Sequence, residues 1–431
     1  MRLTFFLAIF LLSVKTYSRN YYVSAQTGDT NAIGLSIKQP KRTIQEAADL
    51  TRPGDTVFVM NGTYTNSCPT CNVVNITRSG SRSKPIVITN YPNHAPLISF
   101  NGWAGISIEN AVSYVKVSGF KVRGNNSNVN AREAAAQGCK KEDDAYDPIF
   151  NGNGIAIVGR NGKYPHHIEI SRNMVYDCGG GGISAYRADY IIFEDNFVFI
   201  NSWYTVFGTS GISFYQFWNS DKKGGYHNII RGNKCFNNRN YVRWKTNCRI
   251  SDGNGIIVDD FRHEQNNSKL GRYKGKTLIE NNVCWYNGGT GIHTFKSDYI
   301  DILNNTAYCN SQSPELNVGQ ILASMSGNIN IVNNILVSDS LKVINSNYEN
   351  NDIAYYNNLH YNITFPYLTA SALNNASCIN HLNPLFVKPY KGADADFSLQ
   401  EDSPARKRGY HFRMKSLPVG SKQKSLNIGI Y

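Results

Sequence analysis

Only 17% of the 431 residues are charged, while Gly, Asn and aromatic residues are plentiful. This composition argues against a helical protein and favours an all-β protein with many turns. The formal net charge of +13 favours acidic partners, such as uronic acid or sulfated polysaccharides. Nothing in the sequence resembles a nucleic-acid-binding module, so nucleic acid is not an expected partner.

The first eighteen residues have the pattern of a secretory signal peptide. Arg2 precedes an apolar run over residues 3–14, and small or polar residues follow up to Ser18. The run is shorter than the ~20 apolar residues that a membrane-spanning helix needs, and no later stretch approaches that length. We therefore expect cleavage after Ser18 and an extracellular monomer without a membrane span, although a buried first strand is the alternative for residues 1–18.

Residues 40–50, PKRTIQEAADL, carry apolar side chains at the spacing of one helical face, namely Ile44, Ala47, Ala48 and Leu50. The pattern predicts a short amphipathic helix at the N-terminal end of the fold. Such a helix would cover a sheet edge that would otherwise invite aggregation.

Two series of short strands alternate along most of the chain. Members of the first series open with Gly-Ile; they lie at 152–160, 180–188, 209–217, 253–261 and 289–297. Members of the second series end in polar residues and an aligned asparagine; these are Asn173, Asn196, Asn233, Asn282, Asn305 and Asn334, with Asn358 as the next. Several spacings fall between 23 and 29 residues, and the larger ones fit one coil plus an insertion.

Two interleaved strand series at a period near two dozen residues predict a parallel β-helix, in which like residues stack in columns. The asparagines would then form an internal ladder whose amides hydrogen-bond from coil to coil. A propeller is the alternative, but it needs about 40 or more residues per blade. We expect an all-β solenoid of one domain, residues 19–431, closed at its end by residues 383–431.

Both ends of the chain resemble those of secreted right-handed parallel β-helix proteins. The opening, YYVSAQTGDT…QPKRTIQEAADLTRPGDTVFVMNGTY, and the close, NPLFVKPYKGADADFSLQEDSPARKRG…LNIGIY, carry the likeness. Within that group the chain is most similar to polysaccharide lyase family 9, the pectate-lyase-like enzymes. The resemblance covers essentially the whole mature chain and implies a right-handed β-helix that acts on uronate chains.

When the Gly-Ile series is aligned at its isoleucine, one column holds polar side chains, namely Arg187, Gln216, Asp260 and Lys296. The column before it holds Val158, Tyr186, Tyr215, Asp259 and Phe295. Neighbouring coils of a β-helix lie ~4.8 Å apart, so we expect these side chains to gather on one side of the solenoid.

Asp259 and Asp260 stand side by side, and their charges repel unless a cation or basic groups neutralise them. Their hard oxygen donors suit Ca²⁺, which would bind a uronate carboxylate and acidify the C5 proton. A neutral Lys296, one coil on, would abstract that proton. Family 9 lyases are similar, with an Asp-Asp pair for calcium and a later Lys as base, so the resemblance implies these roles. Two further calcium-binding acids of the family do not carry over: His263 stands at the position of one, and the other would lie on the preceding coil, near Gln216.

Further substrate-binding candidates surround these columns. The insert 237–251 carries basic and aromatic residues, including Arg239, Tyr241, Arg243, Trp244 and Lys245. Guanidinium binds carboxylate and aromatic rings stack on sugar faces, so the insert suits an anionic sugar, although a solvated basic loop is the alternative. The remaining substrate-binding candidates are Arg187, Gln216, Trp218, His263 and His293. For each of them a purely structural role is the alternative.

Nine cysteines in an oxidising compartment predict several disulfides and leave at least one thiol unpaired. Cys68 and Cys71 form a lone CxxC with no His at ligand spacing, so a local disulfide is favoured over zinc. Sequons for N-glycosylation begin at Asn61, Asn75, Asn125, Asn266, Asn304, Asn362 and Asn375, and an Asn-rich chain generates several by chance.

Three functions remain open. The first is a secreted lyase that cleaves a pectate-like polysaccharide by Ca²⁺-assisted β-elimination with Lys296 as base. The second is a glycoside hydrolase, which needs two carboxylates about 5–9.5 Å apart and no metal. Asp259 or Asp260, with Asp252 or Asp298, would supply them. The third is a non-catalytic carbohydrate-binding surface protein, in which the acids only pair with nearby basic residues.

Overall fold

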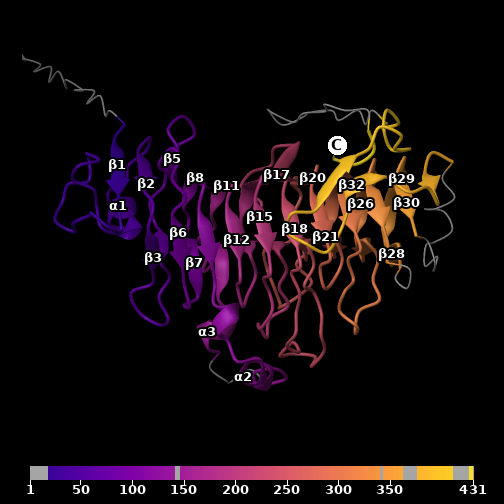
Figure 1. The fold of residues 1–431 in the computed structure, drawn as a ribbon, viewed down its shortest axis with the longest axis horizontal. Coiled ribbons are helices and arrows are strands. Elements are labelled where there is room, and N and C mark those ends of the chain that lie inside the picture. Colours follow the sequence, from indigo (N-terminus) through magenta and orange to yellow (C-terminus); the bar gives the residue numbers. More distant parts are fainter. Residues whose placement is uncertain (1–17, 141–145, 340–342, 363–375, 411–426, 431) are drawn as a thin grey trace, which may run out of the picture.

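The computed structural model describes residues 18–140, 146–339, 343–362, 376–410 and 427–430, so the predicted signal peptide lies outside the described residues apart from Ser18. Within these ranges the chain winds through successive coils, and most coils add one strand to each of three parallel sheets (Figure 1). The predicted parallel β-helix is therefore confirmed. No helix in the described part of the chain is long and apolar enough to cross a membrane.

The first sheet has nine strands: β4 (Val74–Ile76), β7 (Ala104–Glu109), β10 (Asn153–Val158), β13 (Ile183–Tyr186), β16 (Ile212–Tyr215), β19 (Ile256–Asp259), β22 (Ile292–Phe295), β25 (Ile321–Ser324) and β28 (Asn345–Tyr348). The second sheet has eleven: β1 (Asn20–Val23), β2 (Thr56–Val59), β5 (Ile86–Asn90), β8 (Ser113–Ser118), β11 (His166–Ser171), β14 (Asp189–Glu194), β17 (Tyr226–Arg231), β20 (Lys276–Glu280), β23 (Asp298–Leu303), β26 (Gly327–Val332) and β29 (Asn351–Tyr356).

The third sheet also has eleven strands: β3 (Thr63–Thr65), β6 (Leu97–Ser99), β9 (Lys121–Arg123), β12 (Met174–Tyr176), β15 (Phe197–Phe199), β18 (Lys234–Phe236), β21 (Val283–Trp285), β24 (Thr306–Tyr308), β27 (Ile335–Val337), β30 (Leu359–Tyr361) and β31 (Ile379–Asn380). Inward side chains of the three sheets, mostly Ile and Val, form one core along the solenoid. The alternation of buried and exposed residues leaves the outer face of each sheet free to carry function.

The predicted asparagine ladder runs through the interior at the turn from the second sheet to the third. The Oδ1 atom of each asparagine accepts hydrogen bonds from the main-chain N and the Nδ2 of its predecessor, and the distances from Asn196 to Asn233 are both 3.0 Å. The chain of contacts includes Asn173, Asn196, Asn233, Asn282, Asn305, Asn334 and Asn358. Each side-chain amide thus satisfies polar groups that burial would otherwise leave unpaired.

The N-terminal helix is confirmed but begins later than predicted, because α1 spans Ile44–Leu50 rather than 40–50. Thr43 caps it: its side chain accepts from the main-chain N of Glu46, while Glu46 accepts from the main-chain N of Thr43. This reciprocal capping box fixes the start of the helix, and Ile44, Ala47 and Ala48 are buried as the pattern required.

Three further short helices, η1 (Asn126–Asn128), α2 (Ala131–Ala136) and α3 (Pro148–Asn151), lie in the long connection from β9 to β10. This connection projects from the same side of the coils as the loops that lead from the third sheet to the first (Figure 1). A disulfide joins Cys139 of this connection to Cys248 of the β18–β19 loop. The predicted local disulfide between Cys68 and Cys71 is also present.

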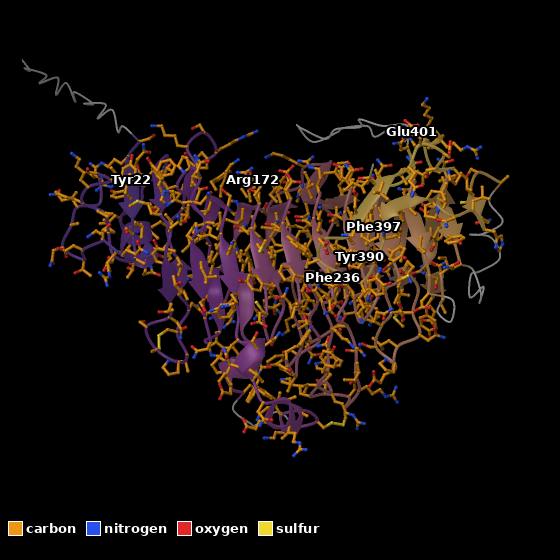
Figure 2. All side chains as sticks on the ribbon, in the orientation of Figure 1. Tyr22, Arg172, Phe236, Tyr390, Phe397 and Glu401 are labelled. Carbon is orange, nitrogen blue, oxygen red and sulfur yellow. A yellow bond between two sulfur atoms is a disulfide. The ribbon has the colours of Figure 1, made fainter. Side chains whose placement is uncertain are left out.

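The C-terminal segment covers the outer face of the third sheet with an antiparallel hairpin of β32 (Phe386–Lys388) and β33 (Asp396–Leu399). Phe397 of this hairpin lies over the third-sheet aromatics in Figure 2, with its ring 5.5 Å from that of Trp285. Trp285 in turn stacks on Phe236 at 5.0 Å. This cover buries apolar rings that would otherwise be exposed.

Candidate functional site

The register of the first sheet brings the predicted columns together. Tyr186, Tyr215, Asp259 and Phe295 are paired partners on β13, β16, β19 and β22. The next residues along these strands are Arg187, Gln216, Asp260 and Lys296, all with a left-handed backbone, at φ values of 51°, 50°, 51° and 46°. The polar column is therefore confirmed. It lies at the C-terminal edge of the first sheet, where each coil turns toward the second.

Asp260 anchors the loop that follows β19. Its side chain is fully buried. Its Oδ1 accepts from the main-chain N of Glu264 at 2.7 Å, and its Oδ2 accepts from the main-chain N of Gln265 at 2.9 Å and from Nε2 of Gln216 at 2.7 Å. Both oxygens thus have donors within the protein, and the carboxylate holds the loop against the sheet edge.

Gln216 and His263 both have hydrogen-bond partners within the protein. Oε1 of Gln216 accepts from Nη2 of Arg187 at 3.3 Å, so the other end of the amide must present N–H groups to Asp260. Nε2 of His263 lies 2.7 Å from the carbonyl oxygen of Phe217, so it carries a proton. Nδ1 of His263 lies 2.7 Å from Oγ of Ser268. Neither residue presents a free ligand atom to a metal or a substrate.

Asp259 is the carboxyl group of the site that tends to keep its proton. Burial raises the pKa of Asp259 well above 3.8, and the charges of Asp252 and Asp260 raise it further. A hydrogen bond from Nε2 of Gln265 at 2.8 Å and the charge of Lys296 act in the opposite direction. The adjacent acids are thus accommodated by the raised pKa of Asp259 and by the hydrogen bonds to Asp260.

Lys296 lies at the end of β22 with its side chain 22% exposed. Its Nζ is 3.3 Å from Oε2 of Glu264 and 5.7 Å from the centre of the Phe295 ring. Glu264 belongs to the loop that Asp260 anchors, so Asp260 controls the surroundings of Lys296. The sequence analysis missed Glu264 and Gln265, because the repeat pattern carries no signal for the path of an inserted loop.

The donor set at the Asp-Asp pair does not fit a calcium ion. Ca²⁺ takes about six to eight oxygen ligands. Across the described ranges, no group of three or more His, Cys, Asp or Glu side chains converges in a way that could hold a metal. Asp260 is shared among three protein donors, one of which is Gln216. Calcium at Asp259 and Asp260 stays a prediction to be measured.

Because the pKa of Asp259 is raised in the folded protein, we expect Asp259→Asn to raise the free energy of unfolding by an amount that depends on pH. The folded protein holds this proton to higher pH than the unfolded chain, so unfolding releases it and the free energy of unfolding falls as pH rises above 3.8. Asparagine removes this loss while keeping an oxygen for Gln265. Urea denaturation at several pH values should show the advantage of Asp259→Asn growing from pH ~4 toward neutrality.

The exposed Glu401→Gln is the matched control, and its difference from the wild type should stay flat with pH. An advantage of Asp259→Asn that does not grow with pH would show that Asp259 ionises normally in the folded protein.

Besides its hydrogen bond to Oε1 of Gln216, the guanidinium of Arg187 makes a cation–π contact. Its guanidinium carbon lies 4.7 Å from the centre of the Tyr186 ring, which stacks on Tyr215 at 5.3 Å. It makes no salt bridge with an acid in the described ranges, and its Nε is buried there without a hydrogen-bond partner. A guanidinium in this state can bind an incoming carboxylate.

The basic insert does not join this column. Arg243, Trp244 and Lys245 lie on the loop that leads into the N-terminal end of β19, whereas the column lies at the C-terminal ends of the strands. Nζ of Lys245 packs over the rings of Tyr146 and Phe207, at 4.9 and 5.1 Å from their centres, while Arg243 is exposed. The insert therefore forms a separate basic region beside the first sheet.

His293 and Trp218 also occupy separate positions. His293 lies on the outer face of β22, paired with Ile257 of β19, and burial lowers its pKa to about 4. Its Nε2 is buried with no hydrogen-bond partner in the described part of the chain. A neutral imidazole cannot attract an anion by charge. Trp218 lies beyond the column, where its ring is 5.1 Å from that of Tyr164.

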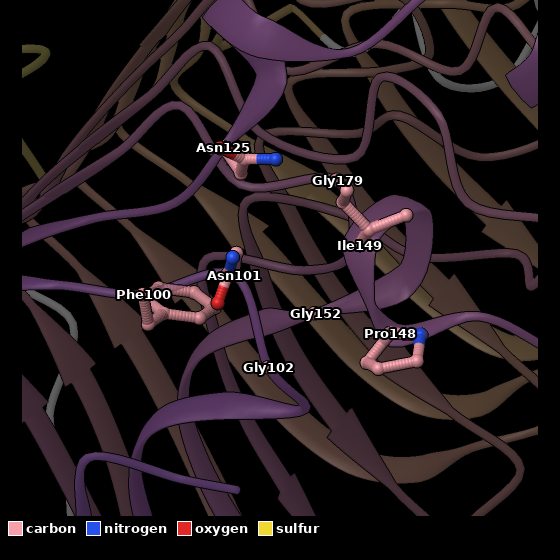
Figure 3. Close-up of a pocket in the computed structure, with 8 residues that line it drawn as sticks. All are labelled: Phe100, Asn101, Gly102, Asn125, Pro148, Ile149, Gly152 and Gly179. Carbon is pink, nitrogen blue, oxygen red and sulfur yellow. The ribbon is translucent and has the colours of Figure 1, made fainter. Parts of the chain in front are cut away.

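A small pocket elsewhere carries no chemistry for this site. Figure 3 shows it among the loops that connect the third sheet to the first, with lining residues Phe100, Asn101, Gly102, Asn125, Pro148, Ile149, Gly152 and Gly179. None of these side chains is titratable, and none was a candidate from the sequence. The column at the edge of the first sheet remains the candidate site.

Comparison with known proteins supports the fold. Residues 21–180 match the family model described as a Pel9A-like, right-handed β-helix region. This match covers less than half of the chain and ends before Arg187, so it shows the right-handed β-helix and says nothing of the site. No curated protein sequence matches the chain.

Solved structures give the same result at low sequence identity. The crystal structure of pectate lyase Pel9A aligns with a TM-score of 0.53 and 15% identity, over 96% of each chain. An alginate lyase from Paenibacillus sp. str. FPU-7 has a TM-score of 0.45 at 16% identity, over 74% of this chain and 94% of its own. A GH136 lacto-N-biosidase from Eubacterium ramulus has a TM-score of 0.39 at 14% identity, over 85% of this chain and 68% of its own. At these identities the likeness concerns the fold alone, and the pectate lyase carries it.

Proposed function

We propose that this β-helix protein with a Pel9A-like region is a secreted lyase that cleaves a uronic-acid-containing, pectate-like polysaccharide by β-elimination. The observation that carries the proposal is the arrangement at the edge of the first sheet. Arg187, Asp259 and Lys296 come from strands in one unbroken run, β13, β16, β19 and β22. We further propose that the protein works as an extracellular monomer, with no nucleic acid or membrane partner.

Each of the three residues suits one part of the reaction. In β-elimination a base removes the C5 proton of a uronate, the bond from C4 to the glycosidic oxygen breaks, and a C4–C5 double bond forms. Arg187 can bind the uronate carboxylate and stabilise the charge that develops on it. Lys296, when neutral, can take the C5 proton, and the raised pKa of Asp259 lets it donate a proton to the departing oxygen.

A glycoside hydrolase is the second candidate, and the raised pKa of Asp259 favours it because a general acid must hold its proton. Of the acids considered from the sequence, Asp298 is unsuited, since its carboxylate is paired with Arg262 at 2.5 Å. Asp260 is held by the loop amides. Asp252 remains, and burial raises its pKa as well.

The test is an assay of the purified protein on pectate, alginate and other uronate chains. A lyase gives ultraviolet absorbance from the unsaturated uronide, whereas a hydrolase gives reducing ends without it. We expect absorbance on at least one uronate chain, equal with chelator and with added Ca²⁺. Reducing ends alone would establish the hydrolase. Strict dependence on Ca²⁺ would show that the Asp-Asp pair binds the ion despite its hydrogen bonds. No product on any chain would leave carbohydrate binding as the function.

A further inference from the structure

We infer that Trp203, Arg239 and Tyr241 form a second subsite, which binds one uronate residue of the polysaccharide through its carboxylate and its ring face. The inference rests on the proposed function, because it concerns another part of the same substrate. The three residues lie on the loops that follow β15 and β18 and lead into β16 and β19. The column at the opposite edge of the first sheet does not include them.

The contacts form an aromatic surface with a cation on it. The guanidinium carbon of Arg239 lies 4.8 Å from the centre of the Tyr241 ring, and Tyr241 is 46% exposed. The ring of Trp203 meets that of Tyr241 edge to face at 5.3 Å. Nε1 of Trp203 donates to the carbonyl oxygen of Asn237 at 3.2 Å, which fixes the indole. Exposed aromatic faces beside a cation suit an acidic sugar.

Arg239 has no acidic partner of its own. It makes no salt bridge with any acid among the described residues, and its Nε is buried there without a hydrogen-bond partner. Burying part of a charged group without a partner is unfavourable. The planar fork of a guanidinium matches a carboxylate with two parallel hydrogen bonds. A uronate would supply the acceptor that the chain does not.

The subsite is held in place before any ligand binds. The main-chain N of Arg239 donates to the carbonyl oxygen of Asn201 at 3.0 Å, and the main-chain N of Tyr241 donates to the carbonyl oxygen of Trp203 at 3.1 Å. These bonds hold the loop after β18 alongside the loop after β15. Gly288 makes room for the arginine, because a Cβ there would lie 2.6 Å from Cγ of Arg239. Side chains that are fixed in advance lose less entropy on binding.

The subsite lies beside the strands that carry the reactive column. Arg239 is next to Gly253 and Gly288, which precede β19 and β22. The C-terminal ends of the same strands carry Asp259 and Lys296. Gly253 and Gly288 precede Asp259 and Lys296 by six and eight residues, an extended length of ~20–26 Å, so the two positions lie at opposite ends of the same strands. An oligosaccharide of several residues is needed to reach both.

Binding measured apart from turnover tests the subsite. Calorimetry would use the full chain carrying Lys296→Ala as the parent, so that the substrate is not cleaved during the titration. The ligands would be oligogalacturonate, oligomannuronate and oligoguluronate. Arg239→Ala removes the charge-assisted pair between the guanidinium and the uronate carboxylate. We therefore expect it to raise Kd by ~10- to 100-fold for the oligosaccharide that binds most tightly. Arg239→Lys should recover only part of this loss, since ammonium lacks the fork. Tyr241→Phe, which keeps the ring, should bind as the parent does.

Matched controls separate this inference from the proposed function. Lys234→Ala removes an exposed charge from the third sheet and should leave Kd unchanged. Carboxyl-reduced oligogalacturonate should bind the parent poorly, and Arg239→Ala should not weaken this binding further. The subsite would be overturned if Arg239→Ala bound the uronate chains as tightly as its parent does. It would also be overturned if a sulfated galactan bound more tightly than every uronate chain, or if no uronate chain bound at all. If Arg239→Ala weakened binding as expected but the wild type formed no product, only the proposed lyase activity would be overturned.

Discussion

Asn233→Leu should lower the free energy of unfolding by about 3–6 kcal/mol, because it removes an interior member of the asparagine ladder without changing side-chain size greatly. Oδ1 of Asn233 accepts from the main-chain N and the Nδ2 of Asn196, each at 3.0 Å. Its Nδ2 donates to Oδ1 of Asn282 at 3.0 Å and to the carbonyl oxygen of Phe193 at 2.9 Å. Leucine leaves the main-chain N of Asn196 buried and unpaired and removes one partner from each of the other groups, although Asn196 Nδ2 keeps the carbonyl of Ile170 and Asn282 Oδ1 keeps the main-chain N of residue 233. Each buried group left unpaired costs about 1–3 kcal/mol.

The measurement is urea denaturation together with hydrogen exchange of main-chain amides in the coils on either side. In a solenoid each coil contacts mainly its neighbours, so we expect faster exchange in the coils of Asn196 and Asn282 than in distant coils. Asn31→Leu, at an exposed position, is the control and should change the free energy of unfolding by less than ~0.5 kcal/mol. An equally small effect of Asn233→Leu would mean that the ladder contributes no net stability.

The ladder also explains why so much of the fold could be predicted from the sequence. A buried asparagine recurs at the same place in the successive coils from Asn173 to Asn358, and Gly-Ile lies at the start of the first-sheet strands β10, β13, β16, β19 and β22. Because side chains alternate strictly along a strand, this repeat fixes both the register and the face of each residue. The columns of Asp259 and Asp260 followed directly, and the structure pairs Asp259 with Tyr215 and Phe295 as expected.

A second ladder escaped prediction although it is built in the same way. It lies at the end of the third sheet and comprises Asn201, Asn238, Asn287, Asn310 and Gln320. Its four asparagines each lie five residues after Asn196, Asn233, Asn282 and Asn305 of the first ladder, so they repeat its spacing. The sequence therefore carried a signal for the second ladder that the analysis of the first one overlooked, and only its last member, Gln320, breaks the pattern.

The contacts of the candidate site were the least predictable. Glu264 and Gln265 reach Lys296 and Asp259 because Asp260 pulls their loop back onto the sheet edge. This long-range consequence depends on three side chains at once, and no local rule encodes it. The same holds for the Cys139–Cys248 disulfide, whose partners are 109 residues apart and meet only when the loops project from the same side of the coils.

Lys296→Ala should lower kcat on the uronate chain that the wild type cleaves by ~10²- to 10⁴-fold, the usual contribution of a general base. The residue contacts Glu264 and the ring of Phe295 and is partly exposed, so its loss should leave the fold intact. Initial rates from ultraviolet absorbance measure the effect, and circular dichroism confirms folding. Lys269→Ala, an exposed lysine in the loop that follows β19, is the control and should retain the wild-type rate.

Lys296→Arg distinguishes a base from a positive charge that merely binds substrate. Arginine keeps the charge and can pair with Glu264, but it does not give up its proton in proteins. A base role therefore predicts that Lys296→Arg is nearly as slow as Lys296→Ala, with a KM close to that of the wild type. If Lys296→Arg retained most of the rate, the lysine would act through its charge. The proton would then have to be taken by another group of the first sheet, and neutral His293, on the outer face of β22, would be the next residue to substitute.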